Sequence, residues 1–183
     1  MKKHLLLTLL LAYSLAIFAQ APKFQTYSAD LLIIATKNGI SQQWQNKDIL
    51  VNLNYKTGNF KAIINNSDFY NKQTNTKINK DSISNESEFI FKGNLPINQI
   101  LNQKTINQDY DIELQLTNND INFSETINMK MNIMRPNQNS NSYRAFTLTG
   151  ILYNDEINLP AFKGYDNEVE MRIMFNAFWT GQK

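Results

Sequence analysis

The sequence predicts an all-β protein, an antiparallel eight-stranded barrel with one or two short helices. Three observations support this fold class. Apolar and polar residues alternate with a period of two through most of the chain, the pattern of strands with one buried face. The 183 residues are 42% hydrophobic, which is enough for the core of a single domain. Eight such segments must pair or close their edges, and an up-and-down barrel does both, while a two-sheet sandwich remains the structural alternative.

The N-terminus has the pattern of a secretory signal peptide. Lys2 and Lys3 are basic, the next stretch up to Phe18 carries no charge after His4, and the small residue Ala19 follows. This apolar run is shorter than the roughly 20 residues that a membrane helix needs, and nothing later in the chain approaches that length. An uncleaved N-terminal anchor is the alternative interpretation.

These features predict the domain organisation and the compartment. We expect residues 1–20 to be a signal peptide and residues 21–183 to be a single β-barrel domain. The mature protein is then periplasmic or secreted, exported in the Gram-negative manner, with no integral membrane segment after signal removal.

Each predicted strand is supported by an alternation of apolar and polar residues within its own range. The clearest run is at the C-terminus, where Val169, Met171 and Ile173 alternate with charged residues. An early hairpin is predicted around Gly58, since glycine adopts a positive φ at no steric cost. The eight predicted strands cover residues 24–36, 49–55, 59–65, 87–93, 109–118, 120–134, 143–153 and 167–179.

Three stretches interrupt this pattern. The polar residues 66–87 predict a short helix or a packed excursion, because loops of that length usually carry some structure. Residues 96–108 begin with proline and place apolar residues on one helical face, which predicts one or two helical turns. Residues 135–144 predict an extended hairpin tip.

The residue inventory argues against an enzyme. The chain has no cysteine, and its only histidine, His4, lies in the predicted signal peptide. Nucleophilic triads, imidazole bases and ordinary zinc sites are therefore excluded from the mature chain, and no cofactor is expected. No glycine-rich phosphate loop is present.

Carboxylates alternate along two of the predicted strands. Asp109, Asp111 and Glu113 share one face, as do Glu168 and Glu170. Both faces lie opposite the apolar ones, so a solvated strand surface is favoured over an acid/base pair.

Net charge excludes a polyanionic partner. Loss of Lys2 and Lys3 leaves 16 basic residues against 16 acidic ones, without a basic cluster. Nucleic acid is therefore not expected as a partner.

Several short motifs resemble those of the YceI-like family. Residues 91–93 (Phe-Lys-Gly) resemble its strand end, and the turn from Tyr55 to Phe60 resembles its early hairpin. The resemblance also covers residues 110–124, 146–151, 153–160 and 168–175, so it spans nearly all of the mature chain. Residues 66–87 lack the histidine-bearing composition common there, so no ligand contact is carried over to that segment.

The resemblance implies a lipocalin-like barrel in the periplasm that binds a long isoprenoid or similar lipid and has no catalytic residues. The inward apolar faces, which we expect to be free of buried charge, supply the candidate cavity. The alternative is an envelope protein with a structural or interaction role and a solidly packed barrel, and a homo-oligomer stays open. The candidate ligand-binding residues are Leu114, Leu116, Met129, Met131, Phe146, Leu148, Met171, Ile173 and Phe175.

Overall fold

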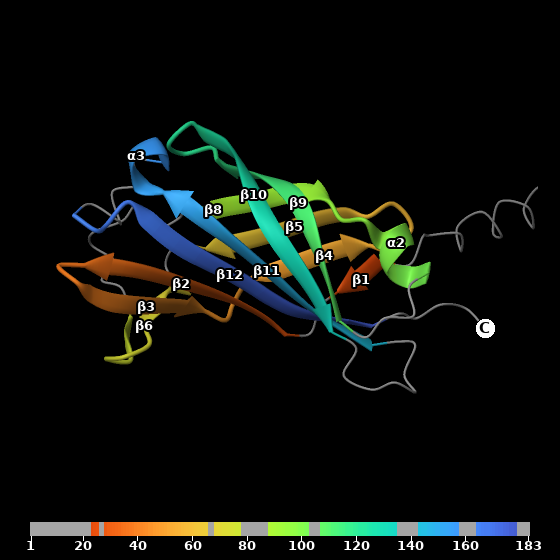
Figure 1. Cartoon of the computed structure of the whole chain (residues 1–183), viewed down its shortest axis with the longest axis horizontal. Helices are drawn as coiled ribbons and strands as arrows, with labels where there is room; N and C mark the ends of the chain where they lie inside the picture. Colours follow the sequence, from red (N-terminus) through yellow and green to blue (C-terminus); the bar gives the residue numbers. More distant parts are fainter. Residues whose placement is uncertain are drawn as a thin grey trace, which may run out of the picture.

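The computed structural model describes residues 23–25, 28–65, 68–77, 88–102, 107–134, 143–157 and 164–178. Within these residues the chain forms a single antiparallel sheet that curls on itself (Figure 1), so the predicted all-β class is confirmed. The predicted signal peptide lies outside the described residues. The strands are β1 (Lys23–Gln25), β2 (Ala29–Lys37), β3 (Ile40–Asn46), β4 (Leu50–Asn54), β5 (Asn59–Asn65), β6 (Tyr70–Asn71), β7 (Thr76–Lys77), β8 (Glu88–Asn94), β9 (Asn107–Asn118), β10 (Phe123–Met134), β11 (Tyr143–Tyr153) and β12 (Glu168–Phe178).

The predicted number of eight strands is wrong, because the described residues contain twelve. The range 24–36 contains two strands, β1 and β2, rather than one. Strand β3 was missed because its polar sequence, with three glutamines, has no apolar alternation. Strands β6 and β7 were missed because each has only two residues.

The strand order explains how the sheet curls. Neighbours run β1-β4-β5-β8-β9-β10-β11-β12-β2-β3-β6-β7. Strands β1 and β2 follow each other in the chain, yet β1 pairs with β4 and β2 pairs with β12. Strand β1, at one edge of the sheet, also lies against the interior strand β12, although no ladder joins β4 to β12 in the described part.

Within the described ranges, two short helices lie outside the sheet. The predicted helical turns after Pro96 are confirmed as α2 (Ile97–Asn102), and α3 (Asn154–Ile157) follows β11. Ile97 and Ile100 of α2 are buried in the core. Among the described residues, no helix has the length and apolar character needed to cross a membrane.

The connections between strands differ in part from the expectations. The hairpin at Gly58 is confirmed, with φ +80° and a hydrogen bond from its N–H to the Asn54 carbonyl oxygen at 2.7 Å. Residues 68–77 form the β6–β7 hairpin instead of a helix, and Phe69 beside it is buried. Residues 78–87 and most of the predicted tip, 135–142, lie outside the described residues.

Candidate ligand-binding site

The nine candidate residues come together in one hydrophobic core. They project inward from β9, β10, β11 and β12 at alternate positions, as the period of two predicts. None is more than 3% exposed. The structure therefore brings all nine together, and their role as ligand contacts stays a prediction.

Aromatic rings pack inside the curled sheet, both between neighbouring strands and across the interior. Phe146 stacks on Phe175 with ring centroids 4.8 Å apart. Phe175 of β12 also meets Phe60 of β5 at 5.6 Å. Side chains therefore fill the space between these strands.

The inward face also contains a charged residue, so the expectation of an interior free of buried charge is wrong. Arg144 is only 6% exposed, and it shares the inward face of β11 with Phe146. Burial raises the pKa of the Tyr55 hydroxyl, while the positive charge of Arg144 acts in the opposite direction. The alternation along β11 could have revealed this, since Arg144 precedes Phe146 by two positions.

Strands β10 and β11 separate beyond the end of their ladder. Their ladder runs from the pair Met134–Ala145 to the pair Met129–Gly150 and goes no further in the described residues. Beyond it, residues 126–128 of β10 and 151–153 of β11 flank a gap that we call the β10–β11 seam. A Cβ on Gly150 would approach Met129 Cγ to 3.0 Å, so the strands are in close contact where the ladder ends.

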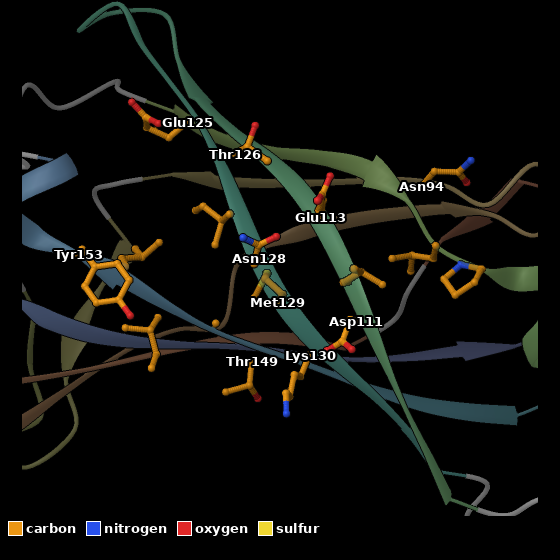
Figure 2. A pocket seen from close by; sticks show the side chains of 17 residues that line it. Asn94, Asp111, Glu113, Glu125, Thr126, Asn128, Met129, Lys130, Thr149 and Tyr153 are labelled. Carbon is orange, nitrogen blue, oxygen red and sulfur yellow. The ribbon is translucent and has the colours of Figure 1, made fainter.

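An open pocket of about 1190 Å³ lies at this seam (Figure 2). We call it the seam pocket. Its lining includes Ile127, Met129 and Leu152, which are buried core residues, and exposed neighbours such as Ile151 and Tyr153. Met129 is the member of the nine candidates that lines it. The complete lining is Asn94, Leu95, Pro96, Asp111, Ile112, Glu113, Glu125, Thr126, Ile127, Asn128, Met129, Lys130, Thr149, Gly150, Ile151, Leu152 and Tyr153.

The charged lining of the seam pocket is mostly acidic. Asp111, Glu113 and Glu125 contribute carboxylates, and Lys130, which pairs with Asp111 across the β9–β10 ladder, contributes the positive charge. In the part of the chain that the structure describes, none of the three carboxylates forms an ion pair.

The three other carboxylates of the two predicted alternating faces are exposed or half-buried, as predicted for a solvated strand surface. Asp109 and Glu168 are exposed, and Asp109 accepts a hydrogen bond from Asn132 Nδ2 at 2.6 Å. Glu170 is half-buried and forms an ion pair with Arg172 at 2.7 Å. Across the described ranges, no group of three or more acidic, histidine or cysteine residues could hold a metal ion.

Sequence reasoning missed the seam pocket. The side chains of β10 and β11 alternate without interruption through the seam, so their pattern gives no sign that the ladder ends. Only the spatial course of the two strands creates the opening.

Comparisons with known proteins support the fold. No family model matches the chain, and no curated protein matches it significantly. Among solved structures, the chain is similar to a polyisoprenoid binding domain from Saccharophagus degradans implicated in plant cell wall breakdown. The TM-score is 0.66 at 9% identity, and the match covers 85% of this chain and 97% of that one. At this identity the similarity establishes a shared fold.

Proposed function

We propose that this protein is an exported, non-enzymatic member of the YceI-like family that holds an isoprenoid or other long lipid within its curled sheet. The observation that carries the proposal is the shared fold with a domain described as polyisoprenoid-binding, which extends over nearly the whole of that domain. The motifs at residues 91–93 and 55–60 support the same family.

The inward face suits such a ligand. Long apolar chains bind in cavities lined mainly by hydrophobic and aromatic side chains. Met129, Met131 and Met171 lie on that face, and methionine adapts its shape more readily than branched residues do. A lipid chain would therefore displace flexible side chains rather than rigid ones.

A solidly packed barrel with a structural role in the envelope is the second candidate. The stacked rings of Phe146 and Phe175, together with the low exposure of the surrounding core, favour it. The two candidates differ in whether the interior opens to admit a ligand.

The first test is extraction of the protein purified from its native envelope. Solvent extraction and mass spectrometry should recover a stoichiometric isoprenoid or other lipid. An extract without lipid, together with no uptake of added isoprenoid, would leave the packed barrel as the better account.

The second test is Ile173→Trp, with Met174→Trp on the opposite face of β12 as the matched control. Ile173 is fully buried, whereas Met174 is half-buried. If a lipid occupies the interior, the new indole takes its place, so lipid content falls while the melting temperature changes little. If the interior is packed solid, Ile173→Trp costs about 1–3 kcal/mol of stability and there is no lipid to lose.

A further inference from the structure

The seam pocket connects two features that are otherwise separate in the molecule. Its inner lining consists of core residues, including Met129, which belongs to the predicted ligand-binding set. Its outer lining is exposed, with Ile151 at 44% and Tyr153 at 40% exposure. The pocket therefore borders both solvent and residues of the hydrophobic core at the place where the β10–β11 ladder ends.

A ligand can enter through such a break in the pairing at a lower free-energy cost than through a complete ladder. Where a ladder is complete, opening the sheet breaks hydrogen bonds between the strands. At the seam, the pairing of β10 with β11 has already ended at Met129 and Gly150, so no such bonds need to break. On the other side of β10, the ladder with β9 continues as far as Phe123–Asn118 and holds that edge in place.

We propose that the β10–β11 seam is the mouth through which an isoprenoid chain enters the core, and that the ligand's uncharged head group stays in the seam pocket. This inference rests on the proposed function, because it assigns the entry route and the head-group class of the same ligand. The apolar tail passes Ile127 and Leu152, while an alcohol or quinone oxygen has exposed polar partners such as Thr126 and Asn128.

The charge of the pocket determines which head group fits. Asp111, Glu113 and Glu125 outnumber Lys130, so a phosphate head would meet a net negative lining. Like charges within the roughly 8–10 Å screening length at ordinary salt repel one another. An isoprenol should therefore bind more tightly than the corresponding isoprenyl phosphate.

The mouth can be blocked reversibly because the chain contains no native cysteine. Ile151→Cys places a single thiol in the seam pocket, and Ile121→Cys in the β9–β10 turn is the control, with a similar exposure of 47% against 44%. Each variant is labelled through a disulfide with a bulky reagent. Uptake of geranylgeraniol is then measured before labelling, after labelling, and after release of the label by a reductant.

We expect labelling to slow uptake at least about tenfold in Ile151→Cys, since entry would then require the blocked mouth to rearrange. Reductant should restore the rate, and labelled Ile121→Cys should behave like the wild-type protein. Equal rates in the two labelled variants, with circular dichroism showing both folded, would overturn the seam as the mouth while leaving lipid binding intact. No uptake by the wild-type protein would overturn the proposed function itself.

The head-group assignment has its own comparison. Geranylgeraniol and geranylgeranyl phosphate are bound to the wild-type protein and to Glu113→Gln/Glu125→Gln at low and moderate salt. We expect the alcohol to bind more tightly, and the difference to shrink in the variant and with added salt. Tighter binding of the phosphate by the wild-type protein would overturn the uncharged head group.

Discussion

Phe146 on β11 stands directly opposite Phe175 on β12, and their rings are parallel with centroids 4.8 Å apart. Phe175 also contacts Phe60 on β5, so one side chain joins the two sides of the curled sheet. Its neighbour in the chain, Met174, points to the opposite face and is only half-buried.

This arrangement predicts a large cost for Phe175→Ala. Truncation removes both ring contacts and leaves a cavity, which should lower the free energy of unfolding by about 3–5 kcal/mol. Urea unfolding monitored by circular dichroism measures the loss. Met174→Ala is the control, and an equal loss there would contradict the role of Phe175 as the link across the core.

Two glycines with positive φ should respond differently to alanine. Gly39 has φ +76° with open space around its would-be Cβ, so Gly39→Ala should cost only the backbone term of about 1–2 kcal/mol. At Gly58, with φ +80°, a Cβ would also collide with the Leu95 carbonyl oxygen. Thermal unfolding of the two variants should show a clearly greater loss for Gly58→Ala, and a reversed order would contradict this account of the hairpin.

The buried Tyr55 predicts a loss of stability at alkaline pH. Burial raises the pKa of its hydroxyl in the folded state above the usual value near 10. Above pH 10 the unfolded chain therefore releases this proton while the folded chain retains it. The free energy of unfolding then falls as pH rises, with a slope approaching about 1.4 kcal/mol per pH unit.

Tyr55→Phe removes that proton and should flatten the decline above about pH 10, where the unfolded tyrosine loses its proton while the folded one keeps it. Tyr165→Phe is the control variant. Burial raises the pKa of the Tyr165 hydroxyl as well, but this side chain is only half-buried. Chemical unfolding at a series of pH values makes the comparison. A decline as steep in Tyr55→Phe as in the wild-type protein would exclude Tyr55 as the source.

The proposed export predicts a processed N-terminus. Mass spectrometry of the protein from its native host should find a chain that begins at or near Gln20, in a periplasmic or secreted fraction. Intact Met1 in a membrane fraction would instead indicate an uncleaved anchor.

The sequence predicted those parts of the fold where burial imposes a period of two. Strand β5 has the predicted bounds, and β11 does as well, because most of their inward residues are apolar. Strand β3 escaped prediction because its position depends on pairing with β2 and β6 rather than on an apolar face of its own. The division of residues 24–36 into β1 and β2 also escaped prediction, since pairing with different partner strands leaves no mark in the composition.

The candidate site was predictable to the same extent. Inward residues such as Ile173 and Leu148 follow directly from alternation, and all nine candidates are buried in one core. The buried charge of Arg144 lay in the same pattern and was overlooked. The seam pocket was not predictable, because it depends on where a ladder ends rather than on which residues alternate.

The pairing of β12 with β2 has a consequence for how the chain folds. This ladder joins Val169 to Ala35 and Phe175 to Ala29, so the first long strand, which pairs with β3 along one edge, finds the partner for its other edge only in the last strand. Contacts between residues so far apart in sequence close a large loop, and proteins dominated by such contacts fold slowly. During synthesis the other edge of β2 must therefore stay unpaired until nearly the whole chain has emerged, while the edge that faces β3 can pair early. An unpaired strand edge can join another chain, so during that interval the free edge of β2 is a site where aggregation can begin.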